Sequence, residues 1–135
     1  MRILVTGHLG YIGTLLAPML AERGHDVVGW DTDLWNKCTF GTGISPFPNI
    51  NKDIRDVAPA DLKGFDVVCH LAALSNDPLG NYDPILTDEI NRLGAVRFGQ
   101  AAKEAGVRKF VFSSTCSNYG TAGDNFVDEK KKKNL

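Results

Sequence analysis

MRILVTGHLGYIG, from Met1 to Gly13, is the segment that decides the fold. It begins with an apolar run, which is typical of a parallel strand covered on both faces. Three glycines follow at intervals of three residues, Gly7, Gly10 and Gly13. Between a strand and a helix, such glycines let the backbone turn sharply, approach a phosphate without an intervening Cβ and pack the helix close to the strand. We therefore expect the amides of this turn, including those of Tyr11 and Ile12, to bind phosphate at the positive end of the helix dipole.

The rest of the chain alternates between short apolar runs and helical stretches. Strands are predicted at residues 2–5, 27–30, 66–70 and 109–112, with a minor one near 49–52. Long helices are predicted at about residues 11–23 and 84–105, each ended by a glycine, and a short helix within 57–64. Right-handed crossovers between such strands predict one α/β domain, a Rossmann-type doubly wound sheet of about five parallel strands in the order 3-2-1-4-5.

A carboxylate follows the second predicted strand, because Asp31 lies 18 residues after Gly13. At this place in a dinucleotide site, a carboxylate accepts hydrogen bonds from the hydroxyls of the adenosine ribose. It would repel a 2′-phosphate, and no arginine follows it directly, so NAD is favoured over NADP as the cofactor. Two plainer interpretations are a structural turn that binds no ligand and, for Asp31, the role of a turn residue.

The composition excludes several classes of function. Lys and Arg total 15 against 16 Asp and Glu, and the net charge of −1 offers no general attraction for nucleic acid or an anionic membrane. No apolar run approaches the roughly 20 residues of a membrane span, and MRILV is too short for a signal peptide, so a cytosolic location is expected. Cys38, Cys69 and Cys116 are widely spaced, and no histidine has a ligand at metal spacing, so neither a disulfide framework nor a metal site is predicted.

The GxxGxxG spacing after Thr6 resembles that of the extended short-chain dehydrogenase/reductase family, in particular its NAD-dependent nucleotide-sugar epimerases and dehydratases. Further segments agree in order over about residues 2–129: Asp53-Ile54-Arg55-Asp56, His70-Leu71-Ala72-Ala73, Asn91-Arg92-Leu93-Gly94, Ser113-Ser114-Thr115 and Tyr119-Gly120. Besides the glycine turn and Asp31, the resemblance implies a set of cofactor-binding residues: Asp53 and Ile54 at the adenine, Leu71, Ala72 and Ala73 at the nicotinamide ribose, and Asn91 and Ser113.

The same resemblance implies a catalytic role for Thr115, which corresponds to the Ser or Thr that hydrogen-bonds the reacting hydroxyl or keto oxygen of the sugar. The family's base is a later tyrosine in a YxxxK pair, whose lysine lowers the tyrosine pKa while hydride passes to NAD. No such pair exists here, because Tyr119 belongs to a structural YG pair and Gly123 stands four residues after it. His8 is expected to flank the pyrophosphate. Residues 75–78 are expected at the ligand crevice, where they either touch a ligand or cap the loop.

The residues at positions 130–135 are predicted to form a lysine-rich, solvated tail after a partial NAD(P)-binding domain at residues 1–129. The sixth strand, the substrate lobe and the YxxxK helix of the family are expected to be missing. The strand at 109–112 is then an open edge that favours a homodimer. The resemblance predicts NAD binding without turnover, in a relative of enzymes that act on a nucleotide sugar. The alternative is a non-catalytic module that binds NAD or docks to a partner.

Overall fold

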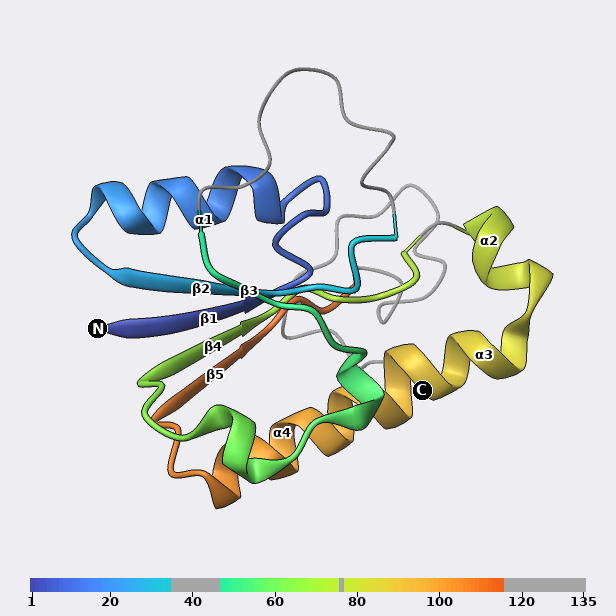
Figure 1. Ribbon diagram of the computed structural model, residues 1–135. Helices are drawn as coiled ribbons and strands as arrows, with labels where there is room; N and C mark the ends of the chain where they lie inside the picture. Colours follow the sequence, from blue (N-terminus) through green and yellow to red (C-terminus); the bar gives the residue numbers. More distant parts are fainter. Residues whose placement is uncertain (35–46, 76, 116–135) are drawn as a thin grey trace, which may run out of the picture.

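The computed structural model describes residues 1–34, 47–75 and 77–115 (Figure 1). These residues form a sheet of five strands in the order β3-β2-β1-β4-β5, and every neighbouring pair is parallel. The strands are β1 (Arg2–Thr6), β2 (Asp26–Trp30), β3 (Asn49–Ile50), β4 (Val67–His70) and β5 (Lys109–Phe112). The predicted strand order is confirmed, and the strand order reverses beside β1, between β1 and β4.

Helices cover both faces of this sheet (Figure 1). Helix α1 (Gly13–Glu22) lies on one face, where Ile3, Val5 and Val27 are buried against it. Helix α4 (Ala95–Glu104) and the short 3-10 helices η1 (Ile54–Asp56) and η2 (Pro59–Leu62) lie on the other, where Leu4 and Trp30 are buried. Successive strand residues point to opposite faces, so strands with consecutive apolar residues supply both cores.

The long helix predicted at residues 84–105 is interrupted. It consists of α3 (Pro84–Asp88), the π-helical turn η3 (Glu89–Gly94) and α4, and a further helix, α2 (Asp77–Tyr82), precedes it. The start at Pro84 is confirmed, because the Asp83 side chain accepts a hydrogen bond from the Leu86 amide at 3.0 Å and caps α3. The π turn coincides with tertiary contacts, since Gly94 packs so closely on Ile54 that an added Cβ would lie 3.2 Å from its Cδ1. Helical periodicity does not reveal such a turn.

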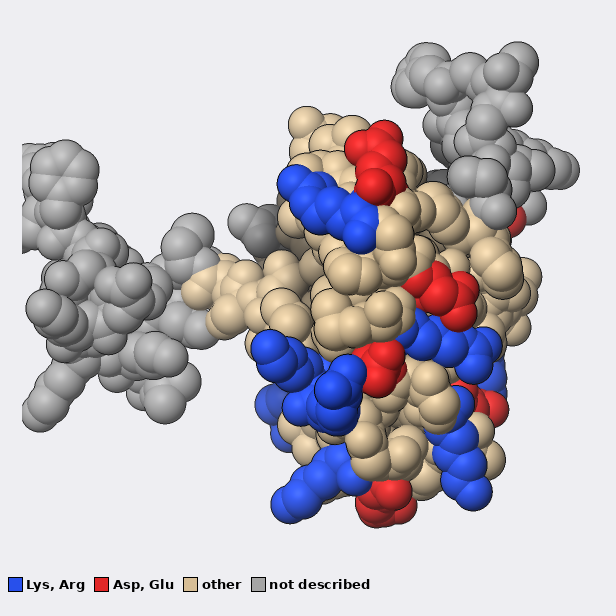
Figure 2. Space-filling view, turned by 90° about the vertical axis from the view of Figure 1, so that its left-hand side faces the viewer, with Lys and Arg blue, Asp and Glu red and all other residues tan. Residues whose placement is uncertain are grey.

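The amino ends of the strands carry interspersed charges of both signs (Figure 2). Arg2 forms an ion pair with Asp26 at 3.4 Å, and Arg108 forms one with Asp66 at 2.9 Å. No helix in the described ranges is long and apolar enough to cross a membrane. The predictions for Cys38, Cys116, the Tyr119-Gly120 pair and the tail at 130–135 lie outside the described residues.

Candidate cofactor site

The glycine turn connects the carboxyl end of β1 to α1. At the positions of Gly7 and Gly13 it leaves no room for a side chain. Gly7 has a φ of +68°, a conformation that favours glycine, and an added Cβ would lie 2.9 Å from the amide nitrogen of Ala72. A Cβ at Gly13 would collide with the carbonyl oxygen of Gly7 and lie 2.5 Å from the Cα of His8. The turn is tied to β2 by a hydrogen bond from the Gly7 amide to the Trp30 carbonyl at 2.8 Å.

The start of α1 presents amide donors that have no partner among the described residues. The amides of Tyr11 and Ile12 donate to no acceptor in the part of the chain that the structure describes, and no side chain caps α1. Tyr11 itself is 91 % exposed, and the first turn of α1 holds no acidic residue. Unpartnered amides at the positive end of a helix dipole form a binding site for an anion.

Asp31 lies beside this turn at the carboxyl end of β2, and its half-buried carboxylate is held in place. Its Oδ2 accepts a hydrogen bond from the Leu9 amide at 3.2 Å, and its Oδ1 accepts one from the Asp33 amide at 3.0 Å. The Asp31 amide donates to the carbonyl of Ile50 on β3 at 3.2 Å. The carboxylate and the anion site therefore belong to one rigid arrangement of β1, β2 and the glycine turn.

Thr6 links the glycine turn to the end of β4. Its hydroxyl oxygen accepts hydrogen bonds from the amides of Leu71 and Ala72, both at 3.1 Å, and lies 3.0 Å from Nδ1 of His70. Since two amides already donate to this oxygen, we assign its own proton to the bond with Nδ1, which makes His70 the Nε2–H tautomer. The hydroxyl therefore fixes the backbone of two residues predicted to line the nicotinamide ribose.

His70 is a neutral histidine inside an aromatic cluster. Its side chain is 1 % exposed, and burial lowers its pKa to about 4. The rings of Phe98, Phe110 and Phe112 surround it, with centroids 5.2, 5.6 and 5.9 Å away. In the sequence, His70 marks only the end of a predicted strand. The signal that could have identified the pair is that Thr6 and His70 are polar residues that each directly follow a run of apolar strand residues and end their strands.

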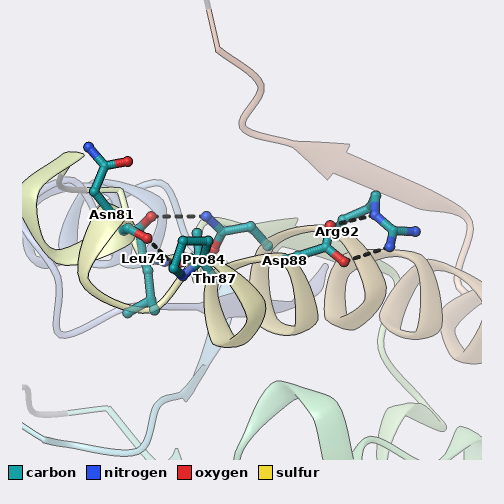
Figure 3. A pocket seen from close by; sticks show the side chains of 8 residues that line it. Leu74, Asn81, Pro84, Thr87, Asp88 and Arg92 are labelled. Carbon is teal, nitrogen blue, oxygen red and sulfur yellow. Dashed lines mark hydrogen bonds and ion pairs between the residues drawn. The ribbon is translucent and has the colours of Figure 1, made fainter.

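Asn91 on η3 holds the loop that follows β4. Its Oδ1 accepts a hydrogen bond from the Leu74 amide at 2.8 Å, and its Nδ2 donates to the Leu74 carbonyl at 2.9 Å. Beside this clamp lies a hollow of about 440 Å³ (Figure 3). Its lining comes from α2, α3 and η3 and from the loop, and consists of Leu74, Gly80, Asn81, Pro84, Thr87, Asp88, Asn91 and Arg92. In this structure, the Asn91 side chain therefore binds the Leu74 backbone and fixes the loop after β4.

Asp53 and Ile54 lie at the start of η1, on the α4 side of the sheet. The Asp53 carboxylate accepts hydrogen bonds from the Arg55 amide and from its guanidinium, both at 2.8 Å, and these bonds hold the pKa of Asp53 below its usual range. Arg55 also reaches Glu89 at 3.3 Å. The Ile54 side chain is buried in the core, so only its backbone is available to a ligand.

Ser113 and Thr115 follow β5 and are exposed at the same edge of the sheet. The Ser113 amide donates to the carbonyl of His70 at 3.1 Å, which continues the pairing of β5 with β4. Ala73 is exposed after β4, and Leu71 and Ala72 are half-buried. Most of the predicted site residues therefore follow the carboxyl ends of the strands, whereas Asp53 and Ile54 lie at the start of η1 and Asn91 lies on η3.

The expectation that His8 flanks the pyrophosphate is wrong for its side chain. The His8 ring is 1 % exposed and points into the structure, over Gly29 of β2. A Cβ at Gly29 would collide with the ring, so the absent side chain of Gly29 creates the space that the ring fills. A glycine within a strand of β-branched and aromatic residues was the available signal, because it marks a close approach.

Comparison with known proteins places this geometry in a family. Residues 3–134 match the model of the NAD dependent epimerase/dehydratase family. The chain belongs to this family. The predicted family and its Rossmann-type sheet are thereby confirmed, and the described residues form the NAD-binding domain that characterises this family.

Relatives in this epimerase/dehydratase family carry out different reactions. The UDP-glucose 4-epimerase of Mycolicibacterium smegmatis is 38 % identical in an alignment of 132 positions, and the match covers 90 % of this chain and 41 % of that protein. The structure of UDP-glucose-4-epimerase from Stenotrophomonas maltophila with bound NAD and formylated UDP-arabinopyranose has a TM-score of 0.85 at 29 % identity, covering 98 % of this chain and 42 % of that one. An NAD-dependent NDP-hexosamine 5,6-dehydratase has a TM-score of 0.81 at 27 % identity, covering 98 % and 43 %. This chain thus spans about two fifths of the length of these relatives.

Proposed function

We propose that this chain binds NAD at the carboxyl ends of β1, β2 and β4. The observation that carries the proposal is the pairing of unpartnered amides at Tyr11 and Ile12 with the fixed carboxylate of Asp31 on the neighbouring strand. The amides follow β1, which borders the point where the strand order reverses, and Asp31 follows the neighbouring strand β2; doubly wound sheets bind their ligands at the carboxyl ends of the strands beside such a reversal. The amides bind the pyrophosphate, and the carboxylate binds the hydroxyls of the adenosine ribose.

The other predicted residues have supporting roles in this proposal. Gly7, Gly10 and Gly13 let the backbone approach the pyrophosphate, and the Leu71–Ala73 segment lines the nicotinamide ribose. Asn91 and Ser113 position the ends of β4 and β5 through the hydrogen bonds described above. Asp53 faces the adenine while its carboxylate is hydrogen-bonded to Arg55, and Ile54 contacts the adenine through its backbone alone. Thr115 meets the reacting oxygen of the substrate.

In the wider epimerase/dehydratase family, NAD accepts a hydride from a nucleotide sugar. We propose that this chain supplies the cofactor half of such a reaction and that the sugar is held by residues outside the described part. By itself the chain binds NAD without turnover, because it holds no YxxxK pair to accept the hydroxyl proton. The domain boundary at residue 129 and the cytosolic location are parts of the same proposal.

A second candidate function is a non-catalytic module that docks to a partner, here a second copy of this chain. β5 is the last strand of the described sheet, and Val111 and Phe112 on it are 54 % and 51 % exposed. An exposed apolar edge strand favours pairing with another chain. Light scattering across a concentration series checks this proposal, and a monomer at high concentration would contradict it.

Titration calorimetry with NAD and NADP tests the main proposal on wild type and on Asp31→Asn. Loss of the charged acceptor weakens NAD binding by about tenfold or more, because hydrogen bonds to a charged group contribute about 1.5–3 kcal/mol. The same substitution reduces the ratio of NAD affinity to NADP affinity, because the neutral amide side chain no longer repels a 2′-phosphate. Asp26→Asn is the matched control, because Asp26 lies at the exposed amino end of the same strand. Equal binding of NAD and NADP by wild type would contradict the role of Asp31.

A further inference from the structure

His8 is a buried titratable residue inside the proposed phosphate-binding turn. Both of its ring nitrogens are buried without a hydrogen-bond partner among the described residues. Buried polar atoms are nearly always paired, so an unpaired imidazole next to a ligand site requires an explanation. The ring is held by packing, because it occupies the space above Gly29 that the side chain of any residue other than glycine at position 29 would fill.

Within the described ranges, the charged groups that act on this ring are two carboxylates. Asp31 and Asp33, after β2, both favour the protonated form, whereas burial favours the neutral form and is the larger effect, so the pKa of His8 is lowered. The glycine turn, the last residue of β1 and the first turn of α1 carry no charged side chain. In the chain without NAD, burial therefore lowers the pKa of His8 more than the two carboxylates raise it, which favours the neutral imidazole.

The unpartnered amides at Tyr11 and Ile12 follow His8 within the same turn. A pyrophosphate bound there would bring further negative charge close to the imidazole. We propose that His8 takes up a proton from solvent when NAD binds, so that NAD binds more tightly in mildly acidic solution. This inference rests on the proposed function. It assigns a proton-linked positioning role to a residue whose side chain does not itself touch the crevice.

The physical basis is thermodynamic linkage. If bound NAD raises the pKa of His8, then protonation of His8 must strengthen NAD binding by the same factor. Each unit by which the pKa rises makes NAD bind up to about tenfold more tightly at low pH. The effect disappears above the pH at which His8 titrates in the NAD-bound chain, because His8 is then neutral in both states.

Calorimetry at pH 6 in two buffers of different ionisation enthalpy measures the number of protons taken up with NAD. We expect a clear fraction of a proton for wild type and none for His8→Phe, whose ring keeps the packing over Gly29 but does not titrate. Between pH 8 and pH 5.5, NAD affinity rises several-fold for wild type and stays flat for His8→Phe. Asp33→Asn removes one of the two carboxylates and reduces the uptake. His25→Asn is the control for an unrelated histidine and leaves the uptake unchanged.

Two results would overturn the inference while leaving the proposed function intact: NAD binding without proton uptake, or equal uptake by wild type and His8→Phe. Absence of NAD binding by wild type would overturn both. If His8→Phe does not fold, NMR titration of the wild-type histidine ring protons decides the question. A higher pKa for His8 with NAD than without it supports the inference, and an unchanged pKa refutes it.

Discussion

Replacing Thr6 by valine tests whether the hydroxyl holds the cofactor site together. Valine has almost the same shape as threonine, so the substitution removes the hydroxyl and leaves the packing. In the wild type this oxygen accepts hydrogen bonds from the amides of Leu71 and Ala72 and donates to Nδ1 of His70. The Leu71 amide keeps a second acceptor, the backbone carbonyl of Thr6 at 3.2 Å. The Ala72 amide and Nδ1 of His70 lose their partner.

The magnitude follows from these two groups. Each of these two polar groups left without a partner in a buried place costs about 1–3 kcal/mol, so Thr6→Val lowers the free energy of unfolding by about 2–6 kcal/mol. That is a large share of the roughly 5–15 kcal/mol by which domains of this kind are stable. Thr6→Ser keeps the hydroxyl and loses only a methyl group, which costs about 1 kcal/mol.

Urea denaturation followed by circular dichroism measures both variants against wild type. NAD affinity, measured on the folded fraction, should fall further in Thr6→Val than in Thr6→Ser, because the backbone of Leu71 and Ala72 is no longer fixed. Equal destabilisation by valine and serine would refute the reasoning, since packing rather than the hydroxyl would then be the important property of Thr6.

Two further predictions concern stability in acid and the shape of the glycine turn. Because burial lowers the pKa of His70 from 6.5 to about 4 in the folded chain, only the unfolded state binds a proton between these values. The contribution of His70 to the free energy of unfolding is fully present above about pH 6.5 and falls by about 3 kcal/mol as the pH drops to about 4. The urea midpoints of His70→Phe, measured over the same pH range, should lack this decrease. Gly13→Ala forces the turn open, because its Cβ would collide with the carbonyl of Gly7, and calorimetry should show loss of NAD binding. Gly99→Ala on α4, where an added Cβ meets nothing within 4 Å, is the control and should leave binding unchanged and stability equal or slightly higher.

The sequence by itself determined the architecture and the place of the site. Runs that are apolar throughout indicate strands buried on both faces, and their alternation with helices sets the order 3-2-1-4-5. The three glycines locate the turn, because sharp turns and close approaches need residues without a Cβ. Asp31 was found in the same way, from its distance along the chain to Gly13. Each of these signals lies within a short stretch of chain or follows a general rule of connectivity.

Only the tertiary structure decided which side chains work together. Thr6 meets His70 because β1 and β4 lie side by side in register, although 64 residues separate the two. Asn91 reaches Leu74 through a π-helical turn, and His8 lies over Gly29 rather than beside the crevice. Such partners depend on strand register, on side-chain direction and on space left by a missing Cβ. These are properties of the packed molecule, and local residue patterns do not encode them separately.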